Sequence, residues 1–241
     1  GLRQMPAAPP QFGPYISISR ELGSGGNELA QSVAEKLGWP LFDREIIEAI
    51  AEKTHVREEL VAQFDEHVRS AFDTYLQNLY TGRVFDSSKY LYHLSQVLLG
   101  IVQYGPAVIL GRGANLILPG ANGLRARLVA PRAVRVKNLA HERQLDEKQA
   151  LHLIEAHDHE QQAFLQRYFQ RSPEDPCAYD VVINTGAVKL EHAAATLLQL
   201  LAVKCGVCVT QFETGDEHVF DTLAGHVCDR GPVRHRAGFV V

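Results

Sequence analysis

A glycine-rich turn near the start of the chain connects a β-prone segment to an amphipathic helical segment. The apolar–polar alternation of residues 15–19 predicts a strand, and Leu29, Val33 and Leu37 recur at the spacing of one helical face. Residues 23–26, with the sequence GSGG, stand between them. Backbone N–H groups in such a turn and the positive end of the following helix converge on one anion. The turn therefore predicts a phosphate-binding site.

The turn departs from the usual phosphate-loop signature, G-x-x-x-x-G-K-[S/T]. We align Gly25 with the second glycine of that signature. Arg20 then occupies the first glycine position, Gly26 the lysine position, and Asn27 the position of the hydroxyl residue that binds Mg²⁺. The pattern by itself leaves open a phosphate loop and an ordinary tight strand-to-helix connection. In a phosphate loop, Arg20 is the candidate for the charge that the absent lysine would supply.

A second candidate for phosphate binding follows a continuous apolar run. Residues 107–110 (AVIL) predict a strand that is buried on both faces, and Arg112 follows it between Gly111 and Gly113. The carboxyl end of a parallel strand is where α/β sheets place their ligands. A guanidinium can hold a phosphate through two parallel hydrogen bonds. Arg112 is therefore expected to bind a ligand.

Strand-like and helical patterns alternate along the chain, which predicts βαβ units and a parallel sheet. We expect an α/β fold with three layers, α/β/α, around a five-stranded parallel sheet, carrying a helical insertion and a lid. The predicted strands are residues 15–19, 41–43, 107–110, 124–129 and 179–183.

Longer stretches resemble the cytidylate kinase-like family of P-loop nucleoside-monophosphate kinases. Residues 16–53, ISISRELGSGGNELAQSVAEKLGWPLFDREIIEAIAEK, resemble the opening of that family, whose loop also lacks the lysine. AVILGRGANLILPG resembles its V-I-[VL]-G-R-G-A segment, LVAPRAVRVKNL the strand-to-helix step that follows, and YDVVINT the closing strand. The resemblance runs in order from about Tyr15 to Leu201.

The resemblance implies ATP as phosphate donor, together with Mg²⁺. From the spacing of its histidines and cysteines, we assign no residue of the chain as a metal ligand. The donor phosphates would be held by the backbone of the loop, which is Gly23, Ser24, Gly25, Gly26 and Asn27. Asp43, with Arg44 beside it, stands where the family's monophosphate-binding segment begins. The resemblance implies that Asp43 helps to organise Mg²⁺ or the acceptor nucleotide, but an aspartate before a helix is equally an N-cap.

The resemblance also assigns catalytic roles. Arg135 matches the family's helix arginine, and with Arg20 and Arg112 it would neutralise charge on the transferred group. Family members tend to carry arginine where this chain has Gln161. That departure bears on catalytic rate, because a lid arginine stabilises transition-state charge.

We expect one main domain. Residues 1–14 would form a flexible lead-in and 15–203 the kinase-like domain, with a helical insertion at 56–104 and a lid at 146–171; residues 204–241 would be a C-terminal extension without an assigned role. His152, His157 and His159 are interpreted as solvated residues of the lid helix. In Cys205-x-x-Cys208, followed by His226 and Cys228, we favour packing cysteines over a zinc site.

The composition of the chain limits the kinds of partner that it is expected to bind. The formal net charge of −4 gives no basic field for nucleic acid, so small nucleotides are the expected ligands. No apolar run reaches the length of a membrane span, and the first residues lack the apolar stretch of a signal peptide. Four cysteines do not make a disulfide framework. We expect a cytoplasmic protein that makes no membrane contact.

Two functions from different classes remain open. The first is a phosphotransferase that moves the γ-phosphate of ATP to CMP, dCMP or a similar small acceptor. The second is a nucleotide-binding sensor or partner module with weak or no turnover, which the missing lysine, Asn27 and Gln161 favour. Phosphorylation of another small metabolite on the same scaffold is a third.

Overall fold

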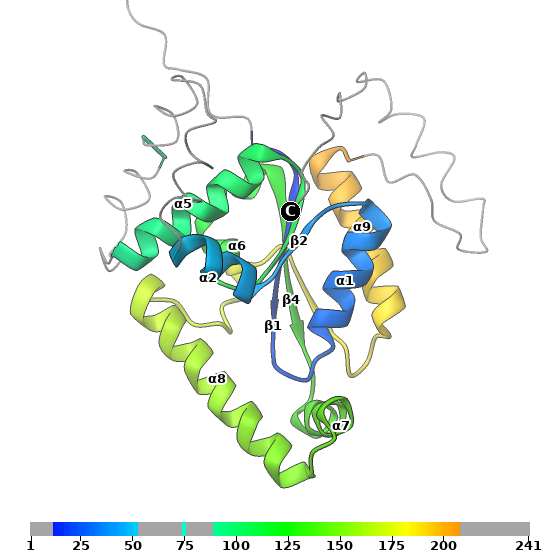
Figure 1. Ribbon diagram of the computed structural model, residues 1–241. Coiled ribbons are helices and arrows are strands. Elements are labelled where there is room, and N and C mark those ends of the chain that lie inside the picture. Colours follow the sequence, from blue (N-terminus) through cyan, green and yellow to red (C-terminus); the bar gives the residue numbers. More distant parts are fainter. Residues whose placement is uncertain (1–11, 53–73, 76–88, 208–241) are drawn as a thin grey trace, which may run out of the picture.

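The computed structural model describes residues 12–52, 74–75 and 89–207, and its centre is a parallel five-stranded sheet (Figure 1). The strand order is β2-β3-β1-β4-β5, and each neighbouring pair is parallel. The strands are β1 (Tyr15–Arg20), β2 (Leu41–Phe42), β3 (Ala107–Leu110), β4 (Gly123–Val129) and β5 (Val181–Asn184). The expected sheet is confirmed in strand number and direction.

Helices cover both faces of the sheet, which gives the predicted α/β/α layers (Figure 1). One face packs against α1 (Gly26–Leu37) and α9 (Leu190–Cys205). The other packs against α2 (Arg44–Glu52), α5 (Lys89–Tyr104), the short α6 (Ala114–Ile117) and the end of α8 (Glu147–Phe169). Helix α7 (Arg132–Arg143) packs against α8 beside the loop, around Leu139, Ala150 and Ile154.

Successive side chains of a strand point to opposite faces of the sheet, which explains why each face has its own apolar core. In β3, Ala107 and Ile109 belong to the core under α5, whereas Val108 and Leu110 belong to the core under α1 and α9. All four side chains are buried, as expected of a strand covered on both faces. The apolar run is therefore a central strand, and its carboxyl end delivers Gly111 and Arg112 to the edge where β1 also ends.

Local signals set the helix boundaries. Helix α1 ends at Leu37 because Gly38 adopts a left-handed backbone, with φ of 64°. Helix α8 begins after Asp146, whose side chain accepts from the Gln149 amide while the Gln149 side chain accepts from the Asp146 amide. Helix α6 and two short 3₁₀ turns, Gly120–Asn122 and Pro176–Ala178, had no predicted counterpart because single turns carry no measurable periodicity.

Some expected segments fall partly outside the described residues. Of the helical insertion at 56–104, the structure describes residues 74–75 and α5. Of the lead-in at 1–14, it describes residues 12–14, and these are packed: Phe12 is buried, and its carbonyl accepts from Asn122 at 2.9 Å. Of the extension at 204–241, it describes residues 204–207, which include the last two residues of α9.

Candidate active site

The glycine-rich loop joins β1 to α1 and is held by hydrogen bonds to its carbonyl groups. Each of the five successive carbonyl oxygens from Glu21 to Gly25 accepts a hydrogen bond. The donors are, in order, the Ser24 amide (3.2 Å), Arg135 Nε (2.8 Å), Asn138 Nδ2 (3.0 Å), Thr185 Oγ1 (2.8 Å) and the Leu29 amide (3.0 Å). With its carbonyls committed to the protein, the loop presents the positive amino end of α1 to the cleft.

Two loop glycines are required by the backbone. Gly23 has a φ of 83° and Gly25 a φ of 77°, in the left-handed region that favours glycine. A Cβ on Gly23 would also collide with the backbone of Arg135, and one on Gly25 would lie 2.9 Å from the Leu190 side chain. The glycines therefore serve a tight curve packed against α7 and α9, as a phosphate loop needs.

Arg20 stands at the end of β1 and its side chain crosses the start of α1. A Cβ on Gly26 would lie 2.5 Å from the Cγ of Arg20, and a Cβ on Gly111 would lie 2.8 Å from its Nη1. The guanidinium thus lies between the loop and the end of β3. Burial and then the charge of Arg44 lower the pKa of Arg20, while Asp43 raises it. Among the described residues, Arg20 forms no ion pair.

Arg112 also reaches the cleft, but it already has partners. Its backbone is left-handed, with φ of 54°, and its side chain is 10% exposed. The guanidinium pairs with Glu48 of α2 at 2.6 Å, contacts the Tyr90 hydroxyl at 3.2 Å and lies over the Phe164 ring at 5.4 Å. Burial, followed by the charge of Glu48, raises the pKa of Tyr90 to about 12. Arg112 is therefore fixed in orientation by three helices.

Arg135 lies behind the loop and is absent from the cleft lining. Its guanidinium makes two hydrogen bonds to Asp158 of α8, at 2.6 and 2.9 Å, in addition to the bond to the Leu22 carbonyl. Glu21 lies 3.7 Å away. The structure gives Arg135 the task of joining α8 to the loop, so it is not brought together with Arg20 and Arg112.

Asp43 and Arg44 line the cleft at the start of α2. One carboxylate oxygen of Asp43 accepts from the Ile46 amide at 2.9 Å, which is the N-cap arrangement. Arg44 is paired with Glu48 at 3.5 Å and is about half exposed. The cap leaves the second oxygen of Asp43 without an assigned partner in the part of the chain that the structure describes, so capping and ligand binding are compatible.

The cleft between these elements has a volume of about 830 Å³. Besides the loop, Asn27, Asp43 and Arg112, its lining includes five residues of α8. Gln161 was expected there from the family resemblance, whereas sequence reasoning did not place His157, Glu160, Phe164 and Leu165 in the site. Their spacing of three and four residues is one face of a helix. The interpretation of His157 as a solvated residue is wrong, whereas His152 and His159 are exposed as expected.

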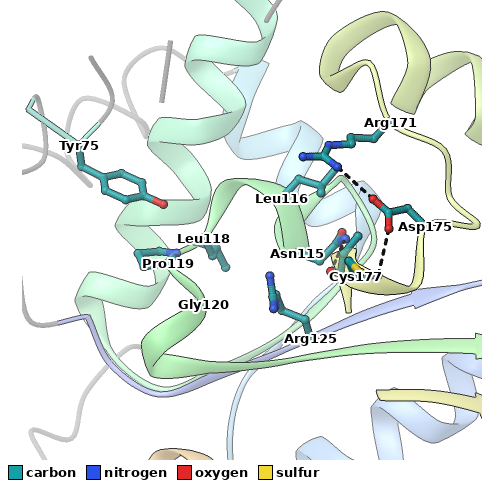
Figure 2. A pocket seen from close by; sticks show the side chains of 11 residues that line it. Tyr75, Asn115, Leu116, Leu118, Pro119, Gly120, Arg125, Arg171, Asp175 and Cys177 are labelled. Atoms are coloured by element: carbon teal, nitrogen blue, oxygen red, sulfur yellow. Dashed lines mark hydrogen bonds and ion pairs between the residues drawn. The ribbon is translucent and has the colours of Figure 1, made fainter. Parts of the chain in front are cut away.

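A second, smaller hollow of about 280 Å³ lies near the amino end of β4 (Figure 2). Its cations are already paired: Arg171 with Asp175 at 3.0 Å, and Arg125 with Asp180 at 2.9 Å. The phosphate loop lies outside its lining. This hollow offers no unpaired charge among the described residues, so the larger cleft is the candidate site.

The described residues contain no group of three or more histidine, cysteine or acidic side chains placed to hold a metal ion. Cys205 is half-buried at the end of α9, and Cys177 is exposed. Cys208, His226 and Cys228 lie outside the described residues. Over the same ranges, no helix combines the length and the apolar character needed to cross a bilayer.

Comparisons with known proteins found similar solved structures and no curated relative. An uncharacterized protein from Eubacterium ventriosum has a similar solved structure, with a TM-score of 0.55 at 21% identity over 78% of this chain and 98% of that one. Shikimate kinase from Bacteroides thetaiotaomicron has a TM-score of 0.40 at 15% identity, over 78% of this chain and 97% of that one. A gluconokinase from Sinorhizobium meliloti has a TM-score of 0.39 at 16% identity, over 80% of this chain and 94% of that one. No curated protein matches the chain.

The first of these similarities shows the shared fold. The family match goes further, because the model of the cytidylate kinase-like family covers residues 15–187. That range contains the loop, all five strands and the α8 face that completes the cleft. The chain therefore belongs to the cytidylate kinase-like family.

Proposed function

We propose that this protein is a phosphotransferase that moves the γ-phosphoryl group of ATP to CMP, dCMP or a similar small acceptor. The observation that carries the proposal is the position of Arg20. Its guanidinium lies in the cleft between the loop and the end of β3, without an ion pair among the described residues. It is thus a cation available at the place where a phosphate loop would otherwise use its lysine.

The loop fits the phosphates of ATP on its own geometry. Its left-handed glycines curve the backbone, its carbonyls are bonded to the protein, and α1 begins directly at Gly26. When bound, ATP would supply the transferable phosphoryl group and Mg²⁺ would neutralise part of its charge. Backbone amides of residues 23–27 would hold the phosphates, and Arg20 would lie against the group that is transferred.

Mg²⁺ is held in such sites by a few oxygen ligands together with the phosphates. Asn27, which replaces the hydroxyl residue of the usual signature, has a carboxamide oxygen at the first turn of α1. Asp43 faces the same cleft with one carboxylate oxygen outside its capping bond. These two side chains are the proposed protein ligands, and an all-protein cage is not required.

The acceptor is proposed to bind on the side of α2 and β3. Arg112 would clamp its phosphate, because the guanidinium is held in place by Glu48 and the Phe164 ring while still lining the cleft. Asp43 and Arg44 lie on the same side. Positioning donor and acceptor phosphates next to each other in one cleft is the main catalytic contribution expected of a phosphotransferase.

A sensor or partner module is the second candidate, and the ion pairs favour it. Arg112 is engaged by Glu48 and Arg135 by Asp158, so two of the three candidate catalytic cations are neutralised by carboxylates. Gln161, at the place of a family arginine, is uncharged and donates to the Arg20 carbonyl at 3.3 Å. Such a site would bind ATP without transferring its phosphate.

A phosphotransfer assay with Mg²⁺, ATP and a panel of acceptors separates the two. The panel contains the nucleoside monophosphates and small hydroxylated metabolites. Turnover on CMP or dCMP that is lost in Arg112→Ala supports the proposal. Arg132→Ala is the matched control, since Arg132 is exposed on α7 and pairs only with Glu155 among the described residues. ATP binding without turnover on any acceptor would leave the sensor module.

A further inference from the structure

One face of α8 forms a wall of the cleft, and His157 is its member nearest the amino end of the helix. His157, Gln161 and Leu165 are each separated by four residues, and all three line the cleft. Gln161 contacts the Arg20 backbone, and Leu165 is buried in the core. Because these three residues share one face of α8, His157 lies on the side of the helix that faces the loop and Arg20.

The Nδ1 atom of His157 is buried and has no hydrogen-bond partner among the described residues. Buried polar nitrogens in folded proteins are almost always paired, because an unpaired one costs the full desolvation of the group. The other buried side-chain atoms in this condition, Ser17 Oγ and Gln103 Oε1, belong to residues outside the cleft lining. Among the described residues, His157 is thus the one that lines the cleft and also carries a buried nitrogen without a hydrogen-bond partner.

We propose that His157 is a ligand-binding residue that contacts a phosphate oxygen of the bound nucleotide and takes up a proton as the phosphate binds. The inference rests on the proposed ATP site, but not on transfer to any acceptor. A phosphate is the fitting ligand because the same cleft holds the amino end of α1 and the Arg20 guanidinium. An imidazole there is a donor to phosphate when neutral and a cation when protonated.

The charges around His157 set the direction of the proton uptake. Burial and then the charge of Arg20 lower the pKa of His157; Asp158 and Glu160 oppose this, and Arg135 adds to it. The remaining charged groups of the cleft on the loop and on α7 are Glu21, Glu142 and Arg143. A bound polyphosphate adds several negative charges, which favours the imidazolium and raises the pKa. The affinity for phosphate should therefore increase as the pH falls from the pKa of His157 in the ligand-bound protein to its lower pKa in the free protein.

The test is a histidine-resolved NMR titration of the whole chain, with and without Mg²⁺-ATP and, separately, Mg²⁺-tripolyphosphate. His157→Gln assigns the resonance and keeps a hydrogen-bonding side chain that cannot titrate. We expect the pKa of His157 to rise with both ligands. The exposed His159 of the same helix is the internal control. Calorimetry should show proton uptake on ATP binding in the wild type and in His159→Gln, but not in His157→Gln. His157→Ala should bind ATP about tenfold more weakly, which is the loss typical of a hydrogen bond to a charged group.

Each outcome has a separate meaning. An unchanged pKa of His157 under saturating ATP would overturn the inference even if the enzyme turns over CMP. A shift with ATP but none with tripolyphosphate would also overturn it, because the contact would then be with the nucleoside. A shift with both ligands and no phosphotransfer would sustain the inference while the proposed activity fails. If neither ligand binds, both this inference and the proposed function are wrong.

Discussion

The side chain of Arg20 lies across Gly26, so close that a Cβ on Gly26 would be 2.5 Å from the Cγ of Arg20 and 2.6 Å from its Cβ. Gly26 stands where the usual phosphate loop has its lysine. The two departures from the signature, Gly26 and Arg20, therefore depend on each other. Because Gly26 has no side chain, the side chain of Arg20 can occupy the space beside the start of α1.

This relationship predicts that Gly26→Ala destabilises the protein by about 1–3 kcal/mol, the usual cost of overpacking. Gly26 has an ordinary helical backbone, so the cost comes from Arg20 alone. In an Arg20→Gly background the same substitution should be neutral or slightly stabilising, since alanine favours a helix over glycine. Chemical denaturation of the four variants measures the coupling.

Gly105→Ala is the matched control, because a Cβ there meets nothing within 4 Å. Its unfolding free energy should stay close to that of the wild type. Equal costs of Gly26→Ala in both backgrounds would show that Arg20 does not occupy the space over Gly26.

Glu48 is predicted to act as a positioning residue for Arg112. Glu48→Gln removes the 2.6 Å ion pair and should raise the acceptor KM roughly fivefold, about 1 kcal/mol, with a smaller change in kcat. The effect should vanish in an Arg112→Ala background, since Glu48 would then have no guanidinium to orient. Steady-state kinetics of the double-mutant cycle decide this, and additive effects would count against it.

The Arg135–Asp158 pair is predicted to hold α8 against the loop. Asp158→Ala leaves a guanidinium that is 6% exposed with only the more distant Glu21 carboxylate, at 3.7 Å, and should cost about 2–3 kcal/mol of unfolding free energy. Glu155→Ala, on the same helix, removes the exposed pair with Arg132 and should cost less than about 1 kcal/mol. Urea denaturation compares the two, and equal costs would contradict the assignment.

Asp180 predicts a specific acid sensitivity. Burial would raise its pKa, but hydrogen bonds from Arg125 and Lys204 outweigh it and lower the pKa to about 2. A lowered native pKa gives stability that is present above the unfolded value of about 3.9 and lost as the pH falls toward 2. Asp180→Asn should therefore melt lower than the wild type at pH 6, with the two curves converging near pH 2.

Glu174, like Asp180, precedes β5 in the chain, and it is exposed. Glu174→Gln is therefore the control and should follow the wild-type melting curve throughout. A constant difference between wild type and Asp180→Asn across this pH range would show that Asp180 contributes through its shape and not through its charge.

The sheet was predictable because its signals are local. The AVIL run predicts a doubly covered strand, and β3 is buried on both faces; the spacing of Leu29, Val33 and Leu37 predicts α1, and Gly38 ends it. The family resemblance also fixed the order of the elements, which periodicity alone does not give.

The partners of the site residues were not predictable. Arg135 and Asp158 are 23 positions apart, and nothing in their local sequence tells a catalytic arginine from one that holds a helix. His157 was misplaced for a related reason: α8 is polar on several faces, so its periodicity does not say which face meets the cleft. The four-residue spacing of His157, Gln161 and Leu165 was the available signal, with Leu165 as its apolar anchor.

The central claim is that this cleft transfers phosphate and that Arg20 supplies the charge of the absent lysine. The direct measurement follows radiolabel from the γ-phosphate of ATP to CMP or dCMP, using wild type, Arg20→Ala and the surface control Arg132→Ala. We predict labelled nucleoside diphosphate from wild type and control. In Arg20→Ala the rate should fall about a hundredfold or more, as for other lost transition-state charges. Label that stays on ATP in the wild type, under conditions where ATP is bound, would contradict it.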